Sequence, residues 1–449
     1  MRVVVLGAGE VGRYLARSLS TEAEVIVVDA DANALAVAED ELDVLTLRGN
    51  VTHRQVLEQA EIGRADLCVS VTGDDAVNVA AAVLAKSAGA VRVVARVDDP
   101  GFYRAEEGVE KHVSGIDACV CASRLIGGEL LRLVTSIDTR FTTSLVGGAI
   151  HAALIELDEG SPVRGRAPTD LRTRSGASVR AVVRGTTIRA ASEVSALDDG
   201  DRIVIVGPPI AVAEMTRTVR HHEGGRAVLM GGGDVGLQLA RTLAALTRDV
   251  RIVESERQRC EELARMLPSV TVLHGDATNL AFLREERIGL AEFVLSVTGS
   301  DEINLMSSLL SREVGARHTF ALAHRPGYAA VYQHLGIEGT TSAHEILART
   351  LQWLLPRRHI VGAAELPGLE WELLELRVPA RLRRTITVRD LSLGSSTVPL
   401  AVLAAAKPVL GRDVGGRLEG GEHLIVIAPK GAASDIERAL KRTEGSVRA

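Results

Sequence analysis

Short apolar runs alternate with segments of helical periodicity over the first part of the chain. Runs rich in β-branched residues predict strands, and apolar residues spaced three or four apart predict the helices between them. This alternation favours a parallel sheet with right-handed crossovers. Strands are expected at 3–6, 25–28, 44–47, 67–71, 91–95 and 118–120, and a closing helix is expected to run from an N-cap at Ser123 to about Val134.

From about Asp138 the pattern changes to short strands that surround glycine turns. The segments "SVRAVVRGTTIRAA" and "LDDGDRIVIVG" are typical of this part, which indicates a small α+β module. The polar stretch "RHHEGGR" at 220–226 then indicates a linker.

The same sequence pattern then repeats in the second part of the chain. "RVVVLGAGEVGRYLARSL", which begins at Arg2, aligns with "RAVLMGGGDVGLQLARTL", which begins at Arg226, at an offset of 224 residues. Three further segments of the first half align with segments of the second. "EVIVVDAD" aligns with "DVRIVESE", "LRGNVT" with "LHGDAT", and "VSVTGDDAVN" with "LSVTGSDEIN". Near the end "LEGGEHLIVIAPKG" resembles "LDDGDRIVIVG". The chain is therefore an internal duplication.

The expected fold class is α/β, with two tandem Rossmann-like parallel-sheet domains that are each followed by a small α+β module. We call 1–221 the first half and 222–449 the second half. The expected domains are a first Rossmann-like nucleotide-binding domain at 1–137, a first small module at 138–221, a second Rossmann-like domain at 222–358 and a second small module at 359–449.

Composition narrows the function. Aromatic residues make up 2% of the chain and the net charge is −6, so neither stacking platforms for bases nor a basic footprint for nucleic acid is expected. No apolar run approaches the ~20 residues that span a bilayer, and no secretory signal opens the chain, which favours a cytosolic protein. Four cysteines lack metal or disulfide spacing and are expected to be buried thiols: Cys68, Cys119, Cys121 and Cys260.

Each half carries a G-x-G-x-x-G loop between a strand and a helix. In the first loop Gly7 permits the tight turn, Gly9 lets the backbone approach a pyrophosphate, and Gly12 allows the helix to pack closely on the strand. The helix behind the loop offers unpaired N–H groups and a partial positive charge to phosphate oxygens. The second loop repeats these positions with Gly231, Gly233 and Gly236. The residues between the last two glycines also belong to the candidate sites: Glu10 and Val11 in the first loop, and Asp234 and Val235 in the second.

An acidic residue follows each loop at the end of the next strand. Asp29 lies 22 residues after Gly7, and Glu254 lies 23 residues after Gly231. A carboxylate at this place accepts hydrogen bonds from ribose hydroxyls and repels a 2′-phosphate, which favours NAD or ATP over NADP.

Further repeated polar residues follow strands, where open α/β sheets bind ligands. Arg96 is the one cation among them and is expected to neutralise a phosphate, whereas its counterpart in the second half is Leu322, with His324 and Arg325 near it but out of register. Helix capping or turn formation is the alternative role, for Thr72 and Thr298 in particular. In the first half these residues are Asn50, Thr72, Asp74 and Arg96, and Asn78 opens the next helix; in the second half they are Asp276, Thr298, Asp301 and Asn304.

These motifs together resemble the cytosolic TrkA subunits of Trk-type bacterial and archaeal potassium uptake. The resemblance covers essentially the whole chain. It rests on "GAGEVG", "VVD", "RGNVT", "VTGDDAVN" and "VVARV" in the first half and on "GGGDVG", "VES", "HGDAT" and "VTGSDEIN" in the second. In that family each half is an RCK (or KTN) unit, which combines a Rossmann-like domain with a C-terminal ligand-sensing module.

The resemblance implies a gating subunit that binds NAD(H), and often ATP or ADP. It also implies a homotetrameric ring that lies in the cytoplasm on the inner face of the cell membrane, beneath a separate potassium-translocating subunit of the TrkH/TrkG type. Asn50 stands where the family commonly has an acid, as Asp276 does in the second half, so the two sites are not expected to be equivalent. The implied nucleotide contacts are Gly7, Gly9, Gly12, Asp29, Thr72 and Arg96 in the first site and Gly231, Gly233, Gly236, Glu254, Asp276 and Thr298 in the second.

Two other functions stay open. An NAD-dependent dehydrogenase of the saccharopine-reductase-like type would need an acid–base group and a substrate pocket over the nicotinamide. The first small module has His151 but no evident Lys, Tyr or second His beside it, so no catalytic residue is assigned. A passive scaffold with relic nucleotide folds is the other alternative, chiefly for the second half. His221, His222 and Glu223 are adjacent in a linker and are not expected to bind a metal.

Overall fold

The computed structural model describes residues 1–20, 23–98, 109–110, 115–137, 139–220, 225–247, 249–325, 327–353, 359–379, 382, 386–388, 397–403 and 417–443. It divides into two compact units, of which the first holds both Rossmann-like sheets and the second holds both small modules. The first unit consists of Met1–Gly127, Val228–Ala240 and Arg251–Leu355, and the second of Gly128–Ala227, Arg241–Val250 and Pro356–Ala449. The expected boundaries after 137, 221 and 358 each adjoin or fall on a position outside the described residues, and they stay predictions.

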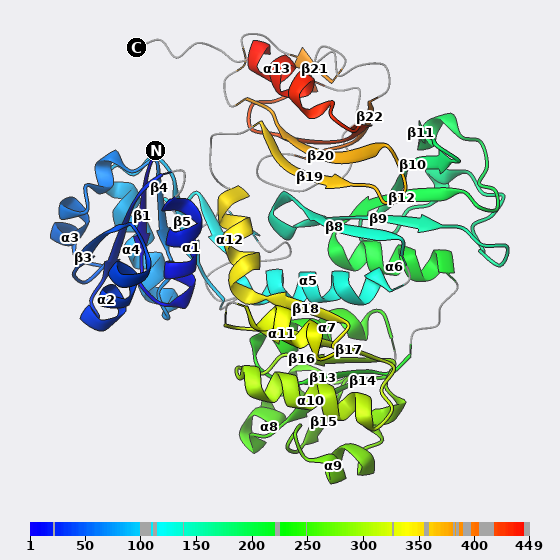
Figure 1. Ribbon diagram of the computed structural model, residues 1–449, viewed down its shortest axis with the longest axis horizontal. Coiled ribbons are helices and arrows are strands. Elements are labelled where there is room, and N and C mark those ends of the chain that lie inside the picture. Colours follow the sequence, from blue (N-terminus) through cyan, green and yellow to red (C-terminus); the bar gives the residue numbers. More distant parts are fainter. Residues whose placement is uncertain are drawn as a thin grey trace. The chain divides into compact units, whose positions relative to one another are not determined.

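The first Rossmann-like domain is a seven-stranded sheet in the order β3-β2-β1-β4-β5-β7-β6, with helices on both faces (Figure 1). All six expected strands are present within two residues of their expected ends, and they run parallel to one another. An unexpected short strand, β6, runs antiparallel to β7. The strands are β1 (Arg2–Leu6), β2 (Glu24–Asp29), β3 (Leu45–Arg48), β4 (Leu67–Ser70), β5 (Val93–Arg96), β6 (Val109–Glu110) and β7 (Ala118–Val120), and the helices are α1 (Glu10–Ser20), α2 (Ala32–Glu41), α3 (Arg54–Gln59), α4 (Asp75–Ser87) and α5 (Ala122–Ser136).

The core of this domain explains why its strands read as unbroken apolar runs. Val3, Val4, Val5 and Leu6 of the central strand β1 have no exposed surface. A parallel sheet that is covered on both faces buries every side chain of its inner strands, so the sequence does not alternate.

Helix α5 begins two residues earlier than an N-cap at Ser123 would give. Ser123 lies inside the helix, so its expected role as the N-cap is wrong. The acceptor for the backbone N–H of Ser123 is instead Oδ1 of Asp98, at 3.0 Å. A carboxylate that is distant in sequence thus takes the place of a local capping side chain.

The second Rossmann-like domain has a six-stranded sheet in the order β15-β14-β13-β16-β17-β18. The order of its first five strands repeats that of the first domain, as the duplication in the sequence predicts. The strands are β13 (Ala227–Met230), β14 (Val250–Glu254), β15 (Thr271–His274), β16 (Phe293–Ser296), β17 (His318–Ala323) and β18 (Gly339–Ser342), and the helices are α7 (Asp234–Ala244), α8 (Arg257–Met266), α9 (Leu280–Glu285), α10 (Asp301–Glu313), α11 (Tyr328–His334) and α12 (Ala343–Trp353).

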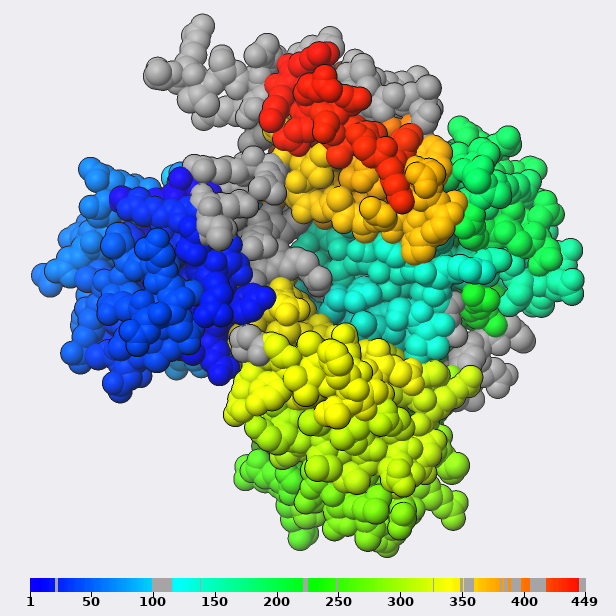
Figure 2. Space-filling view, viewed as in Figure 1, coloured from blue at the N-terminus to red at the C-terminus, as the bar shows by residue number. Residues whose placement is uncertain are grey.

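Both small modules are built on antiparallel sheets. The first is five-stranded in the order β11-β10-β12-β9-β8, and the second combines a four-stranded sheet, β19-β20-β24-β22, with the pair β21-β23. Helix α13, red in Figure 2, covers the outer side of the second module and buries Ile436 and Leu440 against it. The elements are β8 (Phe141–Leu145), β9 (Ile150–Glu156), β10 (Ser178–Arg184), β11 (Thr187–Ala190), β12 (Arg202–Gly207), α6 (Pro209–Arg220), β19 (Ile360–Glu365), β20 (Trp371–Arg377), β21 (Ile386–Thr387), β22 (Val398–Leu403), β23 (Arg417–Leu418), β24 (His423–Pro429) and α13 (Ala433–Thr443).

A buried carboxylate joins the two small modules within the second unit. One oxygen of Glu375 on β20 lies 2.8 Å from Nδ1 of His423, and the other accepts a 2.8 Å hydrogen bond from the backbone N–H of Val146. The Glu375 and His423 side chains are each 3% exposed. Val146 opens a short turn, Val146–Gly148, whose three φ angles are all positive, at 53°, 62° and 95°. Since a β-branched residue pays a steric cost at positive φ, the carboxylate of Glu375 helps to hold a strained turn in place.

None of the helices in the described part of the chain is both long enough and apolar enough to cross a bilayer. The four cysteines are all buried and reduced, as expected. His151 is buried within β9, opposite Ser144 of β8 and Gly207 of β12.

Candidate functional site

The glycines of the first loop have three different environments. Gly7 has a φ of +118°, and a Cβ atom there would lie 3.0 Å from the backbone N of Thr72. A Cβ on Gly12 would lie only 1.9 Å from the carbonyl oxygen of Gly7. A Cβ on Gly9 would meet nothing within 4 Å. Gly7 and Gly12 are therefore required by the fold itself, whereas the open space at Gly9 leaves room for a ligand against the backbone.

The second loop repeats this geometry. Gly231 has a φ of +112°, a Cβ on Gly236 would lie 2.1 Å from the carbonyl oxygen of Gly231, and a Cβ on Gly233 would meet nothing within 4 Å. One additional constraint appears at Gly232, where a Cβ would lie 2.4 Å from a methyl carbon of Leu263. Both loops thus have the shape of a phosphate-binding turn.

The two acids close their glycine loops. Asp29 accepts a 2.6 Å hydrogen bond from the backbone N–H of Ala8, and Glu254 accepts one of 2.8 Å from Gly232. The second oxygen of each carboxylate accepts from a backbone N–H two residues further on, at 2.9 Å, from Asp31 and Glu256 respectively. Both acids therefore help to shape the loop, in addition to their expected role at the ribose.

The charge of Glu254 is stabilised by these contacts. Burial raises the pKa of its carboxyl, but hydrogen bonds from the backbone of Glu256, Gly232 and Ser255 outweigh that effect and leave the pKa below the ordinary value for glutamate. A carboxylate that stays ionised at neutral pH is the form that accepts hydrogen bonds from ribose hydroxyls.

Asn50 and Asp276 form the same turn in the two halves. Oδ1 of Asn50 accepts from the N–H and the hydroxyl of Thr52, at 2.9 and 2.7 Å. Oδ1 of Asp276 accepts from the same groups of Thr278, at 2.8 and 2.7 Å, and these bonds lower the pKa of Asp276. The remaining polar atom is a hydrogen-bond donor in Asn50 and an acceptor in Asp276, so the two halves differ chemically at matched positions.

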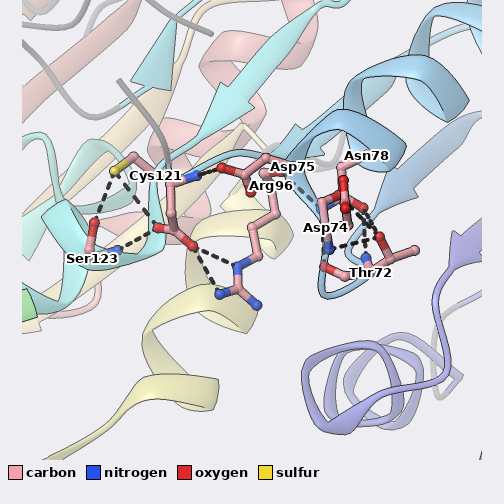
Figure 3. Close-up of polar contacts among 8 residues, drawn as sticks. Thr72, Asp74, Asp75, Asn78, Arg96, Cys121 and Ser123 are labelled. Carbon is pink, nitrogen blue, oxygen red and sulfur yellow. Dashed lines mark hydrogen bonds and ion pairs between the residues drawn. The ribbon is translucent and has the colours of Figure 1, made fainter. Parts of the chain in front are cut away.

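Asn78 and Asn304 are clamps that hold the strand ends together. Asn78 is fully buried, and its Oδ1 accepts from the N–H and hydroxyl of Thr72, at 2.7 and 2.8 Å. Its Nδ2 donates to the carbonyl oxygens of Thr72 and Arg96, both at 3.1 Å. Asn304 makes the matching bonds to Thr298 and Leu322. Because the hydrogen-bonding groups of Asn78 are engaged inside the protein, its side chain positions the site instead of touching a ligand (Figure 3).

Replacement of Asn78 by Ala is expected to destabilise the first Rossmann-like domain by ~2–3 kcal/mol, because it leaves several buried backbone and hydroxyl groups without partners. Denaturant unfolding followed by circular dichroism measures this. Asn33→Ala, at an exposed position of α2, is the matched control and should change stability by less than ~0.5 kcal/mol. Equal stability of the two variants would contradict the clamp.

The remaining loop residues have mixed roles. Asp74 caps helix α4, since its Oδ1 accepts from the N–H of Val77 at 2.9 Å, and Ser300 caps α10 in the same way. Asp301 accepts from the backbone N–H groups of His324 and Arg325, at 2.7 and 2.9 Å. Asp74 therefore has the helix-capping role that was the alternative to ligand binding.

Arg96 is paired with a carboxylate that the sequence did not single out. Its guanidinium donates to Oδ2 of Asp98 at 3.0 and 2.9 Å, as Figure 3 shows for the arginine side chain. In the second half Leu322 is buried where Arg96 stands, and His324 occupies the position of Asp98. The imidazole of His324 lies 2.9 Å from the carbonyl oxygen of Thr298. The sequence signal for Asp98 is its place two residues after Arg96 at the end of β5.

In the first half the candidate residues form a row along one edge of the sheet. Asn50 follows β3, Asp29 ends β2, Gly9 follows β1, Thr72 follows β4 and Arg96 ends β5. These five strands are adjacent in that order, so the row spans four strand spacings, or about 19 Å. A row of this length along the carboxyl ends of parallel strands is suited to an extended ligand with a ribose at one end and phosphates at the glycine loop.

A cavity of about 500 Å³ lies inside the first unit, and both glycine loops open into it. Four helices, α1, α5, α7 and α12, begin at its wall, so their partially positive ends converge there. Of the expected site residues, nine line it: Gly9, Glu10, Val11, Thr72, Arg96, Gly233, Asp234, Val235 and Thr298. The other twelve lie outside the lining: Gly7, Gly12, Asp29, Asn50, Asp74, Asn78, Gly231, Gly236, Glu254, Asp276, Asp301 and Asn304. Lining residues that the sequence analysis missed include Asp98, Ser123 and His344.

Within this unit the last helix of each Rossmann-like domain packs on the first helix of the other. The ring of His344 on α12 stacks on that of Tyr14 on α1, with 6.0 Å between the centroids. Likewise, α5 of the first domain contacts α7 of the second, where a Cβ on Gly127 would lie 3.7 Å from Cγ of Leu239. This exchange of helices encloses the cavity from both sides.

No group of three His, Cys, Asp or Glu in the described ranges is arranged to hold a metal ion. His221, His222 and Glu223, for which no metal was expected, lie outside those ranges.

Comparison with known proteins agrees with this duplicated architecture. The model of the family described as TrkA-N domain matches twice, at 3–120 and 227–343. A Trk system potassium uptake protein TrkA homolog of Archaeoglobus fulgidus is 32% identical over 368 residues, which cover 82% of this chain and 84% of that protein. The Trk system potassium uptake protein TrkA of Halomonas elongata is 29% identical, with 98% of this chain and 99% of the relative covered.

Solved structures show the same fold. The RCK domain of GsuK superposes with a TM-score of 0.57 at 18% identity and covers 98% of this chain and 95% of its own. The GsuK channel bound to NAD superposes with a TM-score of 0.58 at 17% identity, covering 98% of this chain and 78% of its own. A further structure is of GsuK bound to ADP, with a TM-score of 0.52 at 16% identity over 79% of this chain and 69% of its own. With a family model that matches both halves and a curated relative above 30% identity, the chain belongs to the TrkA family and carries two TrkA-N domains.

Proposed function

We propose that this protein is the nucleotide-sensing regulatory subunit of a Trk-type potassium uptake system. Each glycine loop binds the phosphates of NAD(H), ATP or ADP, and the bound nucleotide controls a separate potassium-translocating membrane protein of the TrkH/TrkG type. The observation that carries this proposal is the row of residues along the sheet edge, with a phosphate-shaped loop beside an acid, which occurs once in each half. The names of the relatives and the NAD- and ADP-bound structures of GsuK support it.

In this proposal the ligand lies along the first row with its ribose at Asp29 and its phosphates at Gly9. The N–H groups at the start of α1 bind the phosphates, and Asp29 accepts from the ribose hydroxyls. Thr72 and Arg96 lie at the far end of the row, where Arg96 exchanges part of its contact with Asp98 for a phosphate oxygen. The second site consists of Gly231, Gly233, Gly236, Glu254, Asp276 and Thr298, without a counterpart of Arg96.

Regulation requires that the nucleotide bind two states of the assembly with different affinities. The loops that hold the phosphates lead directly into α1 and α7. Nucleotide binding can therefore change how these helices pack on the last helix of the other domain. A coupling free energy of ~1–3 kcal/mol would change affinity 5- to 150-fold. A homotetrameric ring in the cytoplasm, on the inner face of the cell membrane, is part of the proposal, and light scattering of the purified protein tests its size.

Replacement of Asp29 by Ala is expected to weaken NADH binding by ~1.5–3 kcal/mol, the usual contribution of a hydrogen bond to a charged group. The same change should narrow the preference for NAD over NADP, since the charge that repels a 2′-phosphate is lost. Isothermal titration calorimetry measures both affinities. Asp40→Ala, an exposed acid on α2, is the control and should bind as the wild type does. Unchanged NADH affinity in Asp29→Ala would remove Asp29 from the site.

The proposed function as a whole is tested by titration of the wild-type protein with NADH, NAD, ATP and NADP, together with a dehydrogenase assay. Binding of NAD(H) or ATP, weaker binding of NADP and no turnover support the sensor, and the stoichiometry reports whether one or both loops bind. Hydride transfer to a substrate, or no nucleotide binding, would overturn it. Nucleotide-dependent potassium flux through the membrane partner in vesicles then tests control of transport.

A further inference from the structure

His344 is a residue of the second half that lines the cavity next to the loop of the first half. It lies in the first turn of α12, and the cavity wall that includes it also includes Gly9, Glu10 and Val11. Its ring stacks on Tyr14 of α1 at an interplanar angle of 28°. Its Nε2 atom is 3.6 Å from Oε2 of Glu10. The imidazole is thus fixed in position by the first domain, although α12 belongs to the second.

One polar atom of this ring has no partner within the described part of the protein. The side chain of His344 is only 6% exposed, and its Nδ1 is buried without a hydrogen bond to any described residue. Buried polar groups in folded proteins are nearly always hydrogen-bonded, and one that is not is a candidate for contact with a ligand or ordered water. Burial is the main influence that lowers the pKa of His344, while Glu10 and a hydrogen bond to the backbone of His324 act in the opposite direction. The ring is therefore neutral at physiological pH, with one nitrogen as a donor and the other as an acceptor.

We propose that His344 is a contact of the first nucleotide site, where it forms a hydrogen bond with the phosphate or ribose oxygens of the ligand held by the Gly7–Gly12 loop. This inference rests on the proposed function. It means that a single bound nucleotide touches both halves of the chain. Ligand binding then satisfies the ring nitrogen and strengthens the packing of α12 on α1, which is the physical link that a sensor needs between its ligand and its conformation.

The matching position in the first half is different. By the repeat of strand and helix, Ser123 of α5 corresponds to His344 of α12. Its hydroxyl lies 3.3 Å from Sγ of Cys121, and its backbone N–H is bonded to Asp98. The second glycine loop therefore faces a short hydroxyl with partners of its own instead of an imidazole. His344 makes the two sites unequal and is expected to favour the first.

The test compares His344→Ala and His344→Gln with the wild type in calorimetric titrations with NADH. We expect His344→Ala to weaken the tighter binding event 10- to 100-fold without changing the second. His344→Gln should recover part of this loss, because the amide also offers a donor and an acceptor. His334→Ala, an exposed histidine on α11, is the control and should bind as the wild type does. Wild-type affinity and stoichiometry in His344→Ala would overturn the inference while leaving the proposed function intact, whereas no binding by the wild type would overturn the proposed function itself.

A second measurement follows the unaltered protein during ligand binding, and uses a variant only to assign its signals. The protein is labelled with ¹⁵N-histidine, and the ring signals of His344 are assigned from their absence in His344→Gln. Addition of NADH should shift the Nδ1 resonance towards the value of a hydrogen-bonded nitrogen. An unchanged resonance at saturating NADH would contradict direct contact, even if the alanine variant bound more weakly through altered packing.

Discussion

Gly12→Ala is expected to destabilise the first Rossmann-like domain by on the order of 3 kcal/mol or more, while Gly9→Ala leaves its stability unchanged. The added Cβ at position 12 would lie 1.9 Å from the carbonyl oxygen of Gly7, so either α1 or the loop must move. The gain of ~1 kcal/mol that alanine brings within a helix is too small to offset this. At position 9 the added Cβ meets no protein atom within 4 Å.

The same pair of variants separates the fold from the ligand. Thermal unfolding by calorimetry should show a lowered transition for Gly12→Ala and a wild-type transition for Gly9→Ala. Titration with NADH should nevertheless show at least a tenfold loss of affinity in Gly9→Ala, or about 1.4 kcal/mol, because the methyl group occupies the place where the pyrophosphate approaches. If Gly9→Ala bound NADH normally, the ligand would not lie against this loop.

Glu375→Ala should cost the second compact unit ~2–4 kcal/mol, because it removes the carboxylate that is hydrogen-bonded to a buried imidazole and to a buried backbone N–H. The substitution leaves the imidazole of His423 without its carboxylate and the N–H of Val146 without its acceptor. It also removes the contact that helps to hold Val146 at a φ of 53°. We therefore expect both small modules to be affected, although the substitution lies in only one of them.

Two comparisons isolate the cause of that loss. Glu365→Ala, in the same module, breaks only the exposed ion pair with Lys430 and should cost no more than ~1 kcal/mol. Glu375→Gln keeps an acceptor for Val146 but loses the charge, so its stability should lie between those of the wild type and Glu375→Ala. Hydrogen exchange at the amide of Val146 provides the local measurement, and protection that persisted in Glu375→Ala would contradict the role of this carboxylate.

The parts of this molecule that could be predicted from sequence are those encoded by local pattern. The strands of the first sheet appear as apolar runs because both faces are covered, and the glycine loops are recognisable because their backbone geometry excludes side chains at Gly7 and Gly12. Because the chain is duplicated, the parallel sheet and the glycine loop predicted for the first half are also predicted for the second. The second-half loop confirms this, since its three glycines have the same environments.

The parts that could not be predicted depend on residues brought together by the fold. Asp98 provides the acceptor for the start of α5 and also pairs with Arg96, and the first of these contacts joins residues 25 positions apart that no local pattern connects. Asn78 was expected only as a polar residue that opens a helix, but burial and saturation of its hydrogen bonds make it a clamp. His344 belongs to the cavity only because α12 packs on the first helix of the other domain.

Covalent duplication has a consequence for how a ligand fills an assembly of identical chains. In a symmetric dimer of single domains, every substitution would appear at both sites, so the sites would remain copies of each other. Here Arg96 and Leu322, or Asp98 and His324, occupy equivalent places in one polypeptide and can change independently. Any assembly of identical copies of this chain therefore contains the two kinds of TrkA-N domain in equal number. A nucleotide that binds one kind of domain more tightly would fill that domain in every chain first, so half-saturation would be a defined state with one ligand per chain and not a random mixture.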